Sequence, residues 1–149
     1  MTQQQSTENQ ASARIPLRLP LHPDINEPLI EQLVRRFYDK VRVDAELGPI
    51  FARVITGDWE PHLQTMMAFW SSVTMTTGRY KGMPMPKHVA LTDVRPEHFS
   101  RWLELFRQTA HELCPTDIAD IFIDRADRIA ASLSLGMFGV PYTEAMTRT

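Results

Sequence analysis

Apolar residues recur along the chain at the three- and four-residue spacing of amphipathic helices, and no stretch alternates as a β-strand does. The first helical segment begins after Asn26, a good N-cap, with Pro28 tolerated in its first turn. We expect this helix to end before Gly48-Pro49, because proline disfavours helical backbone at the preceding residue. A short turn over 48–53 should follow. The apolar face of the helix consists of Leu29, Ile30, Leu33, Val34, Phe37, Tyr38 and Val41.

Three more segments, 58–78, 96–114 and 116–139, repeat the helical period. Residues that begin or end helices bound them, such as Asp58 before the first and Pro115 between the last two. The pattern therefore predicts an all-α fold. The inward faces of these three segments are rich in large apolar side chains, and they include Trp59, His62, Met66, Phe69, Trp70, Phe99, Trp102, Phe106, Phe122, Ile129 and Leu133.

A long connection, 78–95, separates the second and third of the four helices. It carries two glycines and two prolines, too many for a long helix, but it keeps apolar anchors such as Tyr80. Loops of this length inside a compact domain are usually functional or disordered, and the anchors favour an ordered one. Pro86 is suited to open a helix of one or two turns that presents His88.

The length of 149 residues, with 43% hydrophobic and 23% charged positions, suits one globular domain. Residues 1–24 are polar and then interrupted by prolines, so we expect a disordered or loosely ordered tail. The folded domain should span 25–138, and 139–149 should form a frayed C-terminal tail. The single cysteine, Cys114, leaves no disulfide and indicates a reducing compartment, most simply the cytoplasm.

Charge and hydropathy argue against two classes of partner. The 16 Lys and Arg residues against 18 Asp and Glu give a formal charge of -2, without the basic excess that holds a nucleic-acid backbone. The apolar run from Met66 to Trp70 is far shorter than the ~20 residues that span a bilayer. We therefore expect neither a nucleic acid nor a membrane as a partner.

Standard enzyme motifs are absent: no two histidines stand four residues apart on a helix, and no pair of cysteines, glycine-rich phosphate loop or serine elbow occurs. What remains is a histidine-bearing loop opposite inward helical faces rich in aromatic and methionine side chains. That combination suits a large, flat, apolar ligand with a metal at its centre, as haem requires. From the residues alone, His98 and His111 are rival iron ligands, although both lie among charged neighbours typical of a solvated face.

The order of several short motifs resembles group III truncated haemoglobins, over about residues 25–134. The resemblance implies a shortened globin fold, in which two antiparallel helix pairs sandwich a haem, here haem b. The motifs are FYDKVR at 37–42, LGPIF at 47–51, W-x-x-H at 59–62, FWSSV at 69–73, TG-x-Y-x-G-x-P at 77–84, KH at 87–88 and HF-x-x-WL-x-LF at 98–106.

The resemblance also implies a role for individual residues. His88 would be the proximal iron ligand, and Tyr38 and Trp102 would donate hydrogen bonds to a bound ligand on the distal side. His62 would stand at the distal entrance. The haem-contacting residues implied are Phe37, Phe51, Met66, Phe69 and Trp70 as walls, with Arg79 and Lys87 as propionate partners unless they are ordinary surface cations.

The helical pattern agrees with the distal assignment, because Tyr38 and Trp102 both fall on inward faces. A buried hydroxyl and a buried indole N–H are donors that need an acceptor, and a bound ligand with partial negative charge supplies one. Its departure would leave buried polar groups unsatisfied, at ~1–3 kcal/mol each, so release should be slow.

Two hypotheses from different classes follow. In the first, the chain is a haem protein, a monomer or weak dimer, that binds O2, NO or CO. Nitric oxide dioxygenation or peroxidase-like turnover would then require a separate reductase. In the second, it is a haem-free helical structural or adaptor module, which explains the amphipathic helices equally well but leaves the histidine-bearing loop unexplained.

Overall fold

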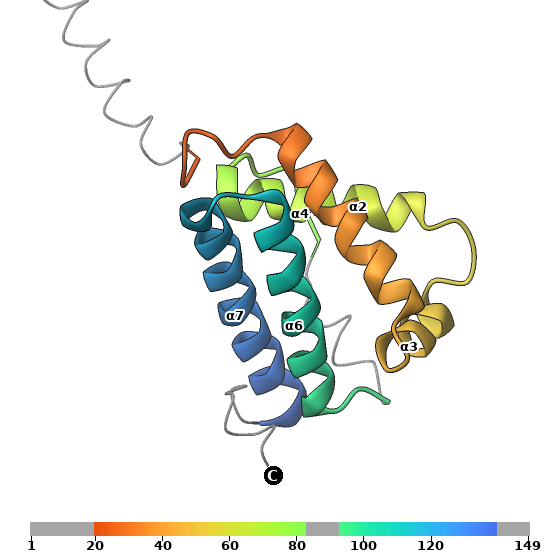
Figure 1. Cartoon of the computed structure of the whole chain (residues 1–149). Coiled ribbons are helices and arrows are strands. Elements are labelled where there is room, and N and C mark those ends of the chain that lie inside the picture. Colours follow the sequence, from red (N-terminus) through yellow and green to blue (C-terminus); the bar gives the residue numbers. More distant parts are fainter. Residues whose placement is uncertain (1–19, 83–92, 140–149) are drawn as a thin grey trace, which may run out of the picture.

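The computed structural model describes residues 20–82 and 93–139, and these residues form five α-helices without a strand. The predicted all-α class is confirmed. In chain order the helices are α2 (Glu27–Val43), α3 (Leu47–Val54), α4 (Glu60–Met75), α6 (Pro96–Leu113) and α7 (Thr116–Phe138) (Figure 1).

Helix α2 begins as the sequence predicts but ends earlier. The Leu29 N–H donates to Asn26 Oδ1 at 2.9 Å, so Asn26 is the N-cap. The helix stops at Val43 because Asp44, in extended backbone, turns its carboxylate to the start of the next helix. There it accepts the Leu47 N–H at 2.9 Å.

The segment expected as a short turn is helix α3. Pro49 falls in its first turn, where the missing N–H has no intrahelical partner to lose. Gly48 lets α3 approach the end of α2, since a Cβ there would lie 2.8 Å from the Arg42 carbonyl oxygen. A side chain at this position would force the two helices apart.

Helix α4 ends three residues before the predicted Gly78. The sequence favours Asp58 as the N-cap, but the N-cap is Trp59, one residue later; Asp58 still accepts the Glu60 N–H on its Oδ1 at 3.0 Å, just before the helix. At the other end Thr76 adopts left-handed backbone, with φ 56°, and breaks the helical path. Such backbone is uncommon outside glycine, so this boundary had no strong signal in the sequence.

Helices α6 and α7 form an antiparallel pair that lies side by side (Figure 1). Pro96 opens α6 and Pro115 separates the two helices, as predicted. Helix α7 ends at Gly139, whose φ of 81° is the left-handed C-cap conformation that glycine adopts without strain. Helix α2 packs against both α4 and α6 and so joins the two halves of the fold.

The centre of the core is a stack of aromatic rings from α4 and α6. Phe106 is 1% exposed and lies between Trp70 and Trp102, with ring centroids 5.0 and 5.7 Å away and nearly parallel planes. Phe122 from α7 closes the far side of Trp70 edge-on, at 5.8 Å. These rings attach α4 to the antiparallel pair.

Residues 20–24, which the sequence assigns to the N-terminal tail, contact the folded part. The Leu21 N–H donates to the Thr74 carbonyl at 2.8 Å, and His22 pairs with Asp117 at the start of α7. The remainder of that tail (1–19), the C-terminal tail from 140 and the loop 83–92 lie outside the described residues. Within the described ranges, no helix combines the length and apolar character needed to cross a membrane.

Candidate functional site

A cavity of about 360 Å³ lies between the helices, and nearly all of its wall is apolar. This volume is within the range of small-molecule and cofactor sites. Side chains from all five helices contribute to it. The lining residues are Tyr38, Leu47, Ile50, Phe51, Val54, Ile55, His62, Thr65, Met66, Phe69, Trp70, Tyr80, Val94, His98, Phe99, Trp102, Ile129 and Leu133.

Tyr38 brings a phenol from α2 to the cavity wall. Its side chain is 6% exposed, and burial raises the pKa of the phenol well above its usual range, so the hydroxyl stays protonated and can donate. Within residues 20–82 and 93–139, no protein group forms a hydrogen bond with this hydroxyl. The Tyr38 O–H is therefore available to a molecule in the cavity.

Trp102 from α6 lines the same cavity, and its indole N–H is a second donor. The Phe37 ring lies beside both side chains, 4.9 Å from Tyr38 and 5.6 Å from Trp102 between centroids, and contacts each edge-on. Phe37 is 2% exposed and stands behind the wall, so it supports the two donors without lining the cavity itself.

His62 from α4 completes the polar part of the wall. Its ring contacts Tyr38 edge-on at 5.0 Å, and its Nε2 atom is buried. The rings of Phe51 and Trp59 pack on the same histidine at 6.4 and 5.8 Å. The arrangement brings together a phenol and an imidazole from two helices, and it surrounds them with aromatic rings.

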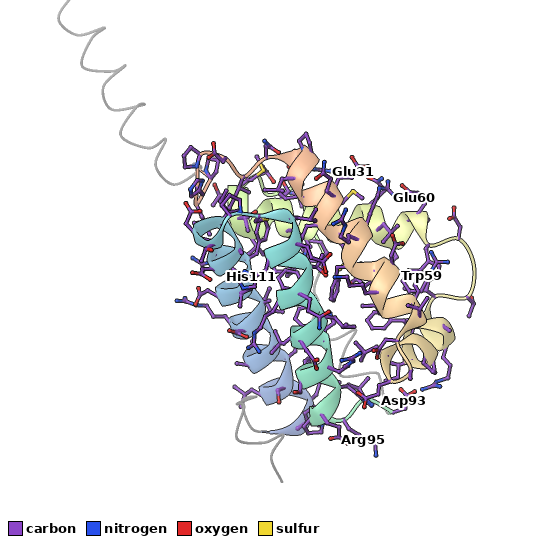
Figure 2. All side chains as sticks on the ribbon, viewed as in Figure 1. Glu31, Trp59, Glu60, Asp93, Arg95 and His111 are labelled. Atoms are coloured by element: carbon purple, nitrogen blue, oxygen red, sulfur yellow. The ribbon has the colours of Figure 1, made fainter. Side chains whose placement is uncertain are left out.

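An exposed ion pair joins α2 to α4, the two helices that carry Tyr38 and His62. Arg35 donates to both carboxylate oxygens of Glu60, at 2.7 and 3.0 Å, and to Glu31 on its own helix. Figure 2 labels the two carboxylates, Glu31 on α2 and Glu60 at the start of α4. The hydrogen bonds from Arg35 and Gln64 lower the pKa of Glu60 to about 2. Bidentate contacts restrict orientation, so this pair favours one placement of α4 on α2.

A second link connects α2, α3 and α6. Asp44 accepts hydrogen bonds from the Arg101 guanidinium at 2.7 Å and from the backbone N–H groups of Leu47 and Glu46. Burial by itself would raise the pKa of this carboxyl, but the hydrogen bonds outweigh it and hold the pKa below the usual range. Asp44 thereby orients α6, which carries Trp102, relative to α2.

The sequence-predicted residues divide into three groups. Seven of them line the cavity together: Tyr38, Phe51, His62, Met66, Phe69, Trp70 and Trp102. Two do not line it: Phe37, predicted as a wall, is buried in the core behind the cavity, and Arg79 pairs with Glu27 at the start of α2. His88 and Lys87 lie outside the described residues.

Sequence reasoning missed His98 as a wall residue. The helical pattern assigned it to a solvated face, but it is only partly exposed and lines the cavity, and its Nδ1 accepts the Arg95 N–H at 2.9 Å. Its place one position before Phe99 on the inward face is the only signal that could have indicated this. His111, the other rival ligand, is exposed as expected.

The cavity can hold a flat apolar molecule and donate hydrogen bonds to a small polar group on it. It offers aromatic and aliphatic walls, two donors that stay protonated, and one imidazole. Among the residues that the structure describes, no three His, Cys, Asp or Glu side chains gather as metal ligands. These features fit a ligand that brings its own metal and takes few bonds from the protein, as haem does.

Comparisons with known proteins give a consistent result. The chain matches no protein-family model. A curated group 3 truncated haemoglobin of Campylobacter jejuni, ctb, is 36% identical over 110 residues, which cover 72% of this chain and 87% of the relative. A crystal structure of a group III truncated haemoglobin from Campylobacter jejuni superposes with a TM-score of 0.74 and 32% identity, over 78% of this chain and 94% of that one. The identity, extending over more than two thirds of the chain, and the shared fold show that this chain belongs to the group 3 truncated haemoglobins.

Proposed function

We propose that the chain binds haem b in the 360 Å³ cavity and takes up O2, NO or CO at the haem iron. The observation that carries the proposal is the buried Tyr38 phenol at the cavity wall, which has no hydrogen-bond partner within the described part of the chain. A hydroxyl at the wall of an apolar cavity is positioned to donate to a polar ligand bound there.

Each residue has a definite task in this proposal. His88 would hold the iron, and the rings of Phe51, Phe69 and Trp70, which line the cavity, would exclude water from the haem. Tyr38 and Trp102 donate to the bound ligand. The haem iron supplies the centre at which a diatomic gas binds, and the residues of the chain set how long that gas stays.

Redox turnover is a secondary part of the proposal. The donors that retain a ligand also stabilise negative charge on it, which favours reactions of bound O2 with NO. Each turnover of that kind would need one electron, which we propose a separate reductase supplies. Arg79 pairs with Glu27 in this structure, so its exchange to a haem propionate would require breaking that contact.

The test is the absorption spectrum of the purified chain after addition of haem. The wild type should show an intense Soret band that shifts on addition of CO. His88→Ala should lose or alter that band, whereas His111→Ala, on the exposed face of α6, should retain it. A wild-type chain that never acquires a Soret band would instead support the haem-free structural module.

A further inference from the structure

We infer that Trp59, held in place by Arg42, is a positioning residue that closes the distal side of the cavity and limits the access of small ligands past His62. This inference rests on the proposed haem function. It concerns a residue outside the cavity wall. In this inference Trp59 limits the rate at which a ligand associates, whereas Tyr38 sets the rate at which it is released.

Trp59 covers three of the rings that form the wall. Its ring centroid lies 6.1 Å from Tyr38, 6.3 Å from Phe51 and 5.8 Å from His62, and all three of these line the cavity. Trp59 itself is partly exposed and is not part of the lining. It lies where α2, α3 and the start of α4 converge (Figure 2). The indole is therefore the outer layer of this side of the cavity.

Arg42 holds the indole from outside. Its guanidinium carbon is 4.8 Å from the Trp59 ring centroid, a cation–π contact. Arg42 stands in the last turn of α2, where the helix dipole favours a cation. The absence of a side chain at Gly48 allows α3 to pack directly on the Arg42 carbonyl, which restrains the backbone that carries the guanidinium.

The packing makes motion of His62 depend on Trp59. The imidazole meets the Tyr38 ring on one side and the indole on another, and its Nε2 atom is buried. The imidazole cannot swing outward unless the indole gives way. Ring contacts and an exposed cation–π contact are weak enough to break transiently. The indole can therefore move aside for a gas molecule and still slow its entry.

A second route is conceivable on the opposite side of α3. A charged groove of about 380 Å³ there shares Ile50 and His98 with the cavity, so these two side chains form the partition. Both partition side chains are restrained, since Ile50 is only 7% exposed and the His98 imidazole accepts the Arg95 N–H at 2.9 Å. The structure therefore favours the Trp59 side.

The experiment measures CO association with the haem-bound chain after flash photolysis. Trp59→Ala should accelerate association on the order of three- to tenfold, the effect of removing one or two ring contacts. Trp59→Phe, which keeps a ring, should stay near the wild-type rate, and Arg42→Gln should fall between them. The matched control is Arg36→Gln on the same helix, which loses a 3.6 Å contact with Glu112 on α6, away from the indole, and should leave the rate unchanged.

A second measurement separates access from general loosening. Diethyl pyrocarbonate modification, followed by mass spectrometry, should label His62 faster in Trp59→Ala than in wild type or Arg36→Gln, while labelling of exposed His111 stays constant. Arg42→Gln changes a surface side chain and carries the test if Trp59→Ala fails to fold or to bind haem.

Two results would overturn the inference. In the first, Arg42→Gln and a haem-bound Trp59→Ala both show the CO association rate and the His62 labelling rate of the wild type. The other is acceleration by Ile50→Ala with none by Trp59→Ala, which would assign access to the charged groove. Absence of a Soret band in the wild type is a different outcome and rejects the proposed haem function instead.

Discussion

Replacement of Tyr38 by Phe tests the distal donor directly, because it removes one oxygen atom and retains the ring. The edge-on contacts of that ring with Phe37 at 4.9 Å and His62 at 5.0 Å should persist, so no cavity is created in the core. The substitution therefore isolates the hydrogen bond to the ligand from packing.

The magnitude follows from the burial of the hydroxyl. Tyr38 is 6% exposed, and burial alone accounts for the raised pKa of its phenol. When a ligand leaves, the buried donor loses its partner at a cost of about 1–3 kcal/mol, so its removal should speed O2 release about 5- to 150-fold. The ligand-free Tyr38→Phe protein should be about as stable as wild type, because the ring and its edge-on contacts are retained.

Two measurements check these expectations. Stopped-flow replacement of O2 by CO gives the release rate, and urea unfolding of the ligand-free chain gives the free energy of unfolding. An unchanged release rate would show that the hydroxyl does not reach the ligand. A loss of several kcal/mol in the free energy of unfolding would show instead that Tyr38 has a structural partner in the protein.

Three other substitutions test the remaining contacts. Trp102→Phe should also speed O2 release. In the double variant with Tyr38→Phe, the change in the activation free energy of release should be smaller than the sum of the two single changes, because both donors serve one ligand. Additive changes in stopped-flow release rates would refute this. Asp44→Asn should lower the free energy of unfolding by about 1–3 kcal/mol in urea at neutral pH. Hydrogen bonds hold the pKa of Asp44 in the folded state below its usual value. The wild type therefore keeps this stability above about pH 4 and loses it as the pH falls through the lower pKa of the folded state. The Asp44→Asn variant should lack that decline. Phe106→Ala should cost about 3–5 kcal/mol in the same assay, since it empties the centre of the aromatic stack; a loss under 1 kcal/mol would contradict that placement.

The sequence determined the local features of the fold. The N-cap at Asn26, the break at Pro115 and the end of the last helix at about 139 were predicted where the structure has them. The inward faces that carry Tyr38 and Trp102 were also predicted. These features depend on hydrogen bonds and side-chain period within a few residues, so a single stretch of sequence contains the information.

The boundaries that were wrong depend on contacts from other parts of the chain. Helix α2 stops at Val43, where Asp44 adopts extended backbone and also binds Arg101, which is 57 residues further along. The Asp44 carboxylate that Arg101 holds also accepts the Leu47 N–H and so helps to begin α3 where the sequence suggested a turn. No local pattern contains such a partner, since its position is set only when α6 packs on α2.

The assembly of the site was decided by tertiary structure for the same reason. Helical periodicity indicates which face of a helix is buried but not which neighbouring face it meets or at what angle. That choice brought Tyr38 and Trp102 to one cavity, placed His98 in its wall and paired Arg79 with Glu27. It also set Trp59 outside the wall under Arg42, a place that its inward helical position alone did not distinguish from that of His62.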